Sequence, residues 1–447
     1  MRAATVVRQS FTFRVRRNTE LGLIILAGVL IIGAYMLATL GSTASLPADI
    51  VPFLVVILGL VGVGHVATRR LTPGADPILL PMAALLNGIG YVFIARLDND
   101  LAGLQAVWTA LGIGAFVATL MLVRRARDLE RFRYTFALIG IGLLLMPLLP
   151  VVGQNINGSR LWVRVAGATF QPGELAKIVL CVFFASYLVE KRELLSEALH
   201  RVGSVMVPNF KHFGPVVLMW GISLVIMTAE RDLGSSLLFF ALFISMLWIA
   251  TGRGAYLAVG GLMFGAGSVI AWNAFAHVHN RVGIWLDPWK DPSGNGYQVV
   301  QALFAFAAGG FAGTNLSQGR PDLIPYVATD FIFAAIGEEL GLLGTTAIIT
   351  IFVLMVGTGL RIAMRAELPF EKLLAAGLTT ILGVQSFVII GGVTRLIPLT
   401  GITLPFVSYG GSSLIANYIL LALLLRISDD QAERTQAQAA AQEETRY

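Results

Sequence analysis

Residues 281–298 read RVGIWLDPWKDPSGNGYQ and form the longest polar interruption of a chain that is otherwise mostly apolar. Asp287 and Asp291 are each followed by proline, which fixes φ and disfavours helix at the preceding residue. Gly294 and Gly296 permit φ above zero. The pattern predicts an ordered, folded-back loop that holds carboxylates at fixed positions, with a solvated connector of ordinary turn residues as the alternative.

The composition around this stretch is that of a membrane protein. The 447 residues are 56% hydrophobic and 13% charged, against about 25% charged residues in soluble proteins. The net charge of +6 falls mostly in short loops, where it reports topology, so we expect no nucleic-acid partner. Cys181 is the single cysteine, which excludes a disulfide framework and a cysteine-based metal site.

Apolar segments of about the length needed to cross a bilayer recur along the chain. They lie near residues 20–40, 50–66, 78–95, 103–123, 134–152, 174–189, 214–229, 233–250, 255–277, 329–357, 371–394 and 405–427. The first run lacks a signal-peptide cleavage site, so we interpret it as a retained helix. The sequence thus predicts an all-α polytopic membrane protein with about 12 transmembrane helices.

The basic residues predict the orientation of these helices. They gather in the N-terminal arm and in alternate connections, and such clusters face the cytoplasm. These residues are Arg2, Arg8, Arg14, Arg16, Arg17, Arg69, Arg70, Arg124, Arg125, Arg127, Arg131, Arg133, Lys191, Arg192, Arg201, Lys211, Arg253, Arg361, Arg365 and Lys372. We expect a multi-pass protein of the cytoplasmic membrane with both termini cytoplasmic and a large extracytoplasmic loop over 278–328.

The outward connection between the fifth and sixth segments is unusually basic. It carries Arg160, Trp162 and Arg164, and Glu174 and Lys177 begin the next helix. Positive charge outside runs against the positive-inside bias; an anionic ligand would explain it, and so would interfacial anchoring of the helices. The two helical charges are three residues apart and can pair, yet a charge inside a bilayer costs at least about 2.5 to 3.5 kcal/mol and usually faces a polar cavity.

Three further outward turns carry polar residues. These are Glu230, Arg231 and Asp232 in one, Asp330 and Glu338 in another, and Arg395 with Ser412 in the last. Asp330 and Glu338 are eight residues apart, so we expect them near one face of a helix at different depths. Taken together, the outward connections predict a polar site open to the outside.

Five long motifs along the chain also resemble those of a known family. RLWVRVAGATFQPGELAK, RDLGSSLL, DPWKDPSGNGYQVVQALFAFAAGGFAG, TDFIFAAIGEELG and IPLTGITLPFVSYGGSS are similar to the motif set of the SEDS family (shape, elongation, division and sporulation), most of all to its actinobacterial RodA type. The resemblance implies a ten-helix core over 78–427. A basic cytoplasmic arm over 1–19 and two additional helices over 20–77 would precede it, and a cytoplasmic tail over 428–447 would follow.

What the resemblance implies is a peptidoglycan glycosyltransferase that polymerises lipid II into glycan strands on the outer side of the membrane during cell elongation. The family's essential aspartate corresponds to Asp291, which would be the general base, with Asp287 as the competing carboxylate. Arg160 and Lys177 would face the departing pyrophosphate, and Glu174 would orient Lys177.

The resemblance also implies ligands and a partner. The substrates would be lipid II and glycan linked to undecaprenyl pyrophosphate, and the partner a class B penicillin-binding protein, a transpeptidase. A divalent cation, Mg or Mn, is a usual companion of pyrophosphate oxygens, and Asp232, Asp330 and Glu338 would shape the cavity or hold it. The expected substrate-binding residues are Arg160, Trp162, Glu174, Lys177, Asp232, Asp330, Arg395 and Ser412.

Two other functions remain open from the sequence. A lipid II flippase or other transporter would also be polytopic, but it would be expected to show repeated halves and paired broken helices, and no clear internal repeat is present. A non-catalytic scaffold for other cell-wall enzymes would tolerate replacement of Asp291, whereas a transferase would not.

Overall fold

A computed structural model describes most of the chain. The described residues are 2–43, 50–150, 152–156, 159–165, 168–193, 199–202, 205–208, 220–221, 224–225, 228, 230 and 232–445. The predicted membrane segment over 214–229 lies largely outside this part, and Arg231 lies outside it entirely.

Helices dominate the structure, as the apolar segments predict. They are α1 (Arg2–Thr43), α2 (Ile50–Leu71), α3 (Leu79–Leu97), α4 (Asn99–Leu122), α5 (Arg133–Leu145), α6 (Pro172–Glu190), α9 (Leu233–Thr251), α10 (Ala255–Ala274), α11 (Ala276–Leu286), α12 (Tyr297–Gly309), α13 (Ile332–Arg365), α14 (Pro369–Val393) and α15 (Gly411–Glu444). In the described part, ten helical stretches are long and apolar enough to cross a membrane. The multi-pass helical fold is confirmed; the number of about twelve spans is not.

Two small antiparallel sheets lie in the connections. Strands β1 (Gly153–Ile156), β2 (Ser159–Val165) and β3 (Ala168–Phe170) form one sheet in that order, with Val163 of β2 opposite Gly153 on one side and Phe170 on the other. Strands β4 (Leu199–Val202) and β5 (Val205–Pro208) form a hairpin. The sequence predicted neither sheet.

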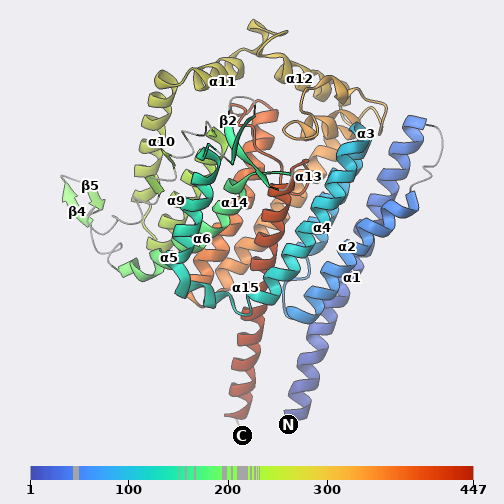
Figure 1. The fold of residues 1–447 in the computed structure, drawn as a ribbon. Helices are drawn as coiled ribbons and strands as arrows, with labels where there is room; N and C mark the ends of the chain where they lie inside the picture. Colours follow the sequence, from blue (N-terminus) through green and yellow to red (C-terminus); the bar gives the residue numbers. More distant parts are fainter. Residues whose placement is uncertain are drawn as a thin grey trace.

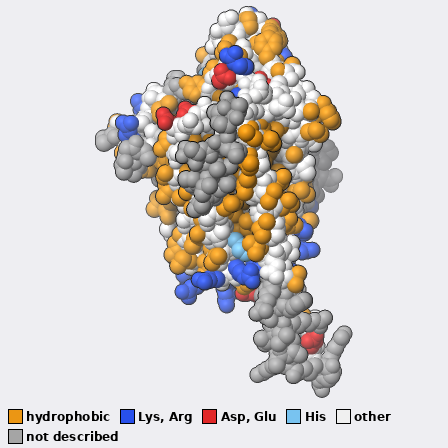
Figure 2. All heavy atoms as spheres, turned by 90° about the vertical axis from the view of Figure 1, so that its right-hand side faces the viewer, with side chains coloured by type: hydrophobic (Ala, Val, Ile, Leu, Met, Phe, Trp, Pro, Cys, Tyr) orange, Lys and Arg blue, Asp and Glu red, His pale blue; other side chains and the backbone are white. Residues whose placement is uncertain are grey.

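The bundle has two distinct ends (Figure 1). Both chain termini extend from one of them, which we call the terminal end. The sheet β1–β3, helices α11 and α12, and the loops over 310–331 and 394–410 lie at the opposite end, the loop end. Figure 2 shows hydrophobic side chains over the flank of the bundle, and Lys and Arg side chains around its lower end. That pattern is expected of a surface that contacts lipid between two aqueous faces.

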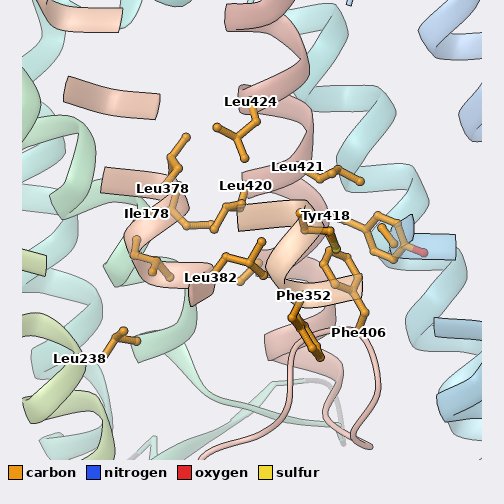
Figure 3. Close-up of a cluster of buried hydrophobic side chains, with 14 of the residues drawn as sticks. Ile178, Leu238, Phe352, Leu378, Leu382, Phe406, Tyr418, Leu420, Leu421 and Leu424 are labelled. Atoms are coloured by element: carbon orange, nitrogen blue, oxygen red, sulfur yellow. The ribbon is translucent and has the colours of Figure 1, made fainter. Parts of the chain in front are cut away.

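Helices α6, α14 and α15 form the centre of the bundle. Their most apolar windows are 78%, 72% and 78% buried, against 11% for α10. Figure 3 shows Leu378 and Leu382 of α14 packed between Ile178 of α6 and Leu420 of α15. Since lipid tails are as apolar as leucine, close packing must hold such helices together.

A break in α13 shapes the loop end. Gly341 has φ 64° and ψ −161°, so the helix is interrupted there. Such a break frees backbone N–H groups, which need partners at membrane depth. The N–H groups of Leu342 and Leu343 donate to the carbonyls of Gly310 and Phe311, at 3.0 and 3.1 Å. The loop after α12 is thereby held against α13 at the break.

Candidate active site at the loop end

The turn after α11 is built around two aspartates. Asp287 begins the short 3₁₀ helix Pro288–Lys290, and its side chain accepts a hydrogen bond from the N–H of Trp289 at 3.1 Å. The carboxylate of Asp291 accepts hydrogen bonds from the backbone N–H and the side-chain amide of Asn295, at 2.8 and 3.3 Å. Both bonds go to Oδ2. The turn is therefore ordered by its own side chains, as the Asp-Pro pairs predict.

The glycines of this turn are needed for space. Neither Gly294 nor Gly296 uses the positive φ that glycine permits, since the glycines with positive φ lie elsewhere. A Cβ on Gly294 would lie 2.4 Å from Oδ2 of Asp291, and one on Gly296 would lie 2.2 Å from the carbonyl oxygen of Pro288. Side chains at these positions would displace the carboxylate or the backbone that holds it.

The carboxylate of Asp291 is exposed. In the described part of the chain it forms no ion pair, and its Oδ1 accepts no hydrogen bond. An exposed, ordered carboxylate with a free oxygen is suited to accept a proton from a bound hydroxyl group.

Helix α11 is fastened to the loop over 394–410. The guanidinium of Arg395 donates to the carbonyls of Trp285 and Leu286, at 2.7 and 2.5 Å, and the indole N–H of Trp285 donates to the carbonyl of Arg395 at 3.2 Å. Arg281 donates to the carbonyl of Thr400 at 2.7 Å. Arg395, expected among the substrate-binding residues, thus holds the helix that leads into the Asp291 turn.

Asp330 lies beside Arg281 under the same loop. A Cβ on Gly401 would lie 3.6 Å from Oδ2 of Asp330 and 3.7 Å from a guanidinium nitrogen of Arg281. Burial raises the pKa of Asp330 to about 6, although the positive charge of Arg281 opposes the shift. A carboxylate with this pKa changes its charge just below neutral pH.

Glu338 does not share a helical face with Asp330, contrary to the prediction. Helix α13 begins at Ile332, after Asp330. The Glu338 carboxylate instead accepts a hydrogen bond from the backbone N–H of Arg320 at 2.7 Å. Its neighbour Glu339 pairs with Arg96 of α3 at 2.6 Å. These two carboxylates hold the loop over 314–320 against the bundle.

A buried cation occupies the start of α6. The ammonium of Lys177 lies 2.9 Å from each carboxylate oxygen of Glu174 and 2.9 Å from the amide oxygen of Gln385. The predicted pairing of Glu174 with Lys177 is confirmed. Gln385 also donates to the carbonyl of Thr403 at 2.9 Å, and the N–H of Gln171 donates to the hydroxyl of Ser412 at 2.7 Å. The cluster therefore joins α6, α14 and the segment that begins α15.

Asp232 caps helix α9 next to this cluster. Its carboxylate accepts a hydrogen bond from the N–H of Ser235 at 2.9 Å. Burial raises the pKa of Asp232; the bond to Ser235 and the charge of Lys177 oppose the shift. Burial and the neighbouring Asp232 raise the pKa of Glu230 to about 8. The cap explains why an acidic residue occupies the first position before α9.

Strand β2 presents a row of polar side chains. Arg160, Trp162 and Arg164 alternate with buried Val163, so they share one face of the strand. Arg160 and Arg164 are exposed, and neither forms an ion pair within the described part of the chain. Two such guanidinium groups on one face suit an anionic ligand.

The described residues do not support a metal centre at Asp232, Asp330 and Glu338. Among them, no group of three or more His, Cys, Asp or Glu side chains is arranged to hold an ion. Asp232 caps a helix, Asp330 faces Arg281, and Glu338 binds a loop. We therefore assign no reaction step to a protein-bound cation.

The predicted site residues thus do not form one cluster. Glu174, Lys177 and Ser412 belong to the buried group, with Asp232 and Asp330 beside it. Asp291 stands apart in its exposed turn, with no hydrogen bond or ion pair to the buried group in the described part. Gln385 was not among the predicted site residues. A glutamine inside the apolar segment over 371–394 was the available signal, because polar groups at membrane depth usually have partners.

Comparisons with known proteins agree with this architecture. The profile of a family named for FtsW, RodA and SpoVE and described as "Cell cycle protein" matches residues 83–433. The peptidoglycan glycosyltransferase RodA of Mycobacterium tuberculosis is 44% identical over 424 residues, which cover 92% of this chain and 90% of that protein. The probable peptidoglycan glycosyltransferase FtsW of Geobacter metallireducens is 33% identical over 377 residues, covering 79% and 94%.

Solved structures show the same fold. One chain, from a study of how a peptidoglycan synthase complex coordinates polymerization and crosslinking, matches with a TM-score of 0.67 at 27% identity, covering 80% of this chain and 98% of that one. The rod shape determining protein RodA of Thermus thermophilus matches with a TM-score of 0.55 at 25% identity, covering 80% and 97%.

Proposed function

The chain belongs to the FtsW, RodA and SpoVE family of cell cycle proteins, and from that membership we infer that it is a peptidoglycan glycosyltransferase. The alignment with the relative that is 44% identical covers 92% of the chain. The inference therefore applies to the protein as a whole. We propose that its substrate is lipid II and that it builds glycan strands on the outer side of the cytoplasmic membrane.

The proposed reaction is an inverting glycosyl transfer. The 4-hydroxyl group of the acceptor GlcNAc attacks the anomeric carbon of the donor MurNAc, and the bond from that carbon to the undecaprenyl pyrophosphate breaks. The hydroxyl proton passes to a general base. Pyrophosphate leaves without needing an acid, so one carboxylate suffices, unlike the two that glycosidases use.

Asp291 is the proposed base. One observation carries the assignment: its carboxylate is exposed, is held by Asn295 through one oxygen, and keeps the other oxygen free. Asp287 is also exposed and bonded through one oxygen, but by a single hydrogen bond from Trp289, whereas Asp291 is held by two from Asn295. The absence of a side chain at Gly294 leaves the room that the Asp291 carboxylate occupies.

Positive charge for the pyrophosphate would come from strand β2. Arg160 and Arg164 are exposed on one face of the strand, with Trp162 between them. Lys177 is 2% exposed and already paired with Glu174, so in this arrangement it supports the start of α6 beneath the sheet. A divalent cation enters the proposal only as a companion of the substrate's own pyrophosphate.

We further propose that both termini are cytoplasmic and that the loop end faces outward. The connections from α2 to α3 and from α4 to α5, both expected inside, lie toward the terminal end, and both termini extend from that end (Figure 1). The hairpin of β4 and β5, which carries Arg201, lies at the side of the bundle. The proposed partner is a class B penicillin-binding protein, by analogy with the chain from a peptidoglycan synthase complex that shares this fold.

The experiment is polymerisation of lipid II by the purified full-length chain, alone and with its transpeptidase, with crosslinking blocked by a β-lactam. The expected product is a ladder of glycan strands. If no glycan forms with the partner present while lipid II crosses the bilayer of vesicles that contain the chain, the protein is a transporter and the proposal is wrong.

A further inference from the structure

A cavity of about 160 Å³ lies toward the terminal end, at the other end of the bundle from the proposed active site (Figure 1). It is open on one side and is lined by the ends of α6 and α9 and by the turn between α13 and α14. Its polar lining consists of Arg192, Glu367 and Lys372. None of these side chains takes part in the proposed glycosyl transfer.

In the described part of the chain, the two cations of the cavity have no acidic partner. Within the described residues, Arg192 and Lys372 form no ion pair, whereas the adjacent Lys191 pairs with Glu190. The carboxylate of Glu367 receives only the side-chain amide of Gln438, at 3.2 Å from each oxygen. The cavity therefore offers two positive charges and one negative charge to a ligand.

The rest of the lining is apolar and lies at the depth of a membrane interface. Val189, Ile249 and Leu373 contribute aliphatic surface. The spans Pro172–Glu190 and Gly234–Thr251 both end here. Trp248, one residue from the lining, is 42% exposed, and exposed tryptophan near the end of a span is typical of headgroup depth.

We propose that this cavity binds the headgroup of a membrane phospholipid that carries a phosphate and a primary ammonium, as phosphatidylethanolamine does. The phosphate would lie between Arg192 and Lys372, and the ammonium would donate hydrogen bonds to Glu367. The acyl chains would continue along the aliphatic lining.

Size and charge both favour this ligand. The volume is close to the roughly 150 Å³ of a cavity that holds a benzene-sized molecule, and phosphoethanolamine is of similar size. A glycerol headgroup would satisfy the cations but bring no positive charge to Glu367. A trimethylammonium group carries the charge but cannot donate a hydrogen bond. Basic pockets between helices near the cytoplasmic surface are known to take phospholipid headgroups.

The test is native mass spectrometry of the full-length chain titrated with phosphatidylethanolamine, phosphatidylglycerol or phosphatidylcholine of identical acyl chains. We expect phosphatidylethanolamine to bind most tightly. Arg192→Gln with Lys372→Gln should weaken its binding at least about tenfold, the loss of charge-assisted bonds to phosphate. Glu367→Gln should remove the preference over phosphatidylglycerol.

The matched control is Arg124→Gln with Arg127→Gln, which removes two exposed cations elsewhere at the terminal end. It should leave phosphatidylethanolamine binding within about twofold of the native chain, since neither side chain lines the cavity. Equal binding of the three lipids would overturn the proposal. So would an equal loss of phosphatidylethanolamine binding in the control variant and in the Arg192→Gln, Lys372→Gln variant. Displacement of the lipid by inorganic phosphate at comparable affinity would assign the cavity to a soluble anion.

Discussion

Lys177→Met removes the buried cation at the start of α6 and leaves the carboxylate of Glu174 without its partner. The two side chains are 3% and 5% exposed and lie 2.9 Å apart. At an effective dielectric constant of about 20, their attraction is about 6 kcal/mol before the cost of desolvation. Removing one member of a buried pair typically destabilises a protein by about 3 to 5 kcal/mol, because the other charge remains buried.

The expected change in melting temperature follows from the chain length. Unfolding entropy is about 2 cal/mol/K per residue, so for 447 residues a loss of this size lowers Tm by about 3 to 5 °C. Glu174→Gln combined with Lys177→Met removes both charges and should recover at least about 2 kcal/mol relative to the sum of the single changes.

The assay is thermal unfolding of the purified chain, followed by tryptophan fluorescence at a fixed scan rate. Arg320→Met is the control, since Arg320 pairs with Asp322 at 3.7 Å with side chains 72% and 54% exposed. Loss of this exposed ion pair should lower the free energy of unfolding by less than about 1 kcal/mol. The reasoning would be refuted if the losses of unfolding free energy in Glu174→Gln and Lys177→Met simply added in the double variant. It would also be refuted if Lys177→Met were as stable as Arg320→Met.

Three further changes test the loop end. Burial raises the pKa of Asp330 from 3.8 to about 6, so the folded chain binds a proton more readily between these values, and its free energy of unfolding falls by up to roughly 3 kcal/mol as pH rises through them. Asp330→Asn should abolish this fall, measured as Tm from pH 4 to 7. Gly294→Ala places a Cβ 2.4 Å from a carboxylate oxygen of Asp291 and should lower polymerisation about 10- to 100-fold with little change in Tm. Gly41→Ala places a Cβ 2.3 Å from the carbonyl oxygen of Leu316 and should cost about 1 to 3 kcal/mol by overpacking.

The glycine controls come from open positions. Alanine at Gly283 in α11 and at Gly33 in α1 would meet nothing within 4 Å, so both variants should match the native chain in activity and stability to within about 0.5 kcal/mol. Full activity of Gly294→Ala, or an unchanged Tm of Gly41→Ala, would contradict the packing described above. If the Tm of Asp330→Asn changed with pH in the same way as the Tm of the native chain, the assignment of this pH dependence to Asp330 would be wrong.

The membrane fold was predictable because each span carries its own signal. Apolar segments over 78–95 and 371–394 correspond to α3 and α14, since a helix that crosses lipid must be apolar along most of its length. The break at Gly341 was hidden in the apolar segment over 329–357, because nothing local distinguishes a strained glycine from a packed one. The sheet β1–β3 was missed for a related reason: strands this short depend on partners that their own sequence does not specify.

The candidate site was predictable where contacts are local. Glu174 and Lys177 are three residues apart and pair as expected. Their third partner, Gln385, comes from α14, a contact across the bundle that spacing cannot indicate. The expectation for Asp330 and Glu338 failed because it assumed one continuous helix, whereas α13 begins between them.

We propose above all that the Asp291 carboxylate takes the proton of the acceptor hydroxyl. The most direct measurement compares lipid II polymerisation by the native chain, Asp291→Asn and Asp287→Asn, each purified with the partner transpeptidase and matched for Tm. We expect the polymerisation rate to fall at least about 100-fold in Asp291→Asn, the size expected for removal of a general base, and much less in Asp287→Asn. Normal polymerisation by Asp291→Asn, or the larger loss in Asp287→Asn, would contradict it.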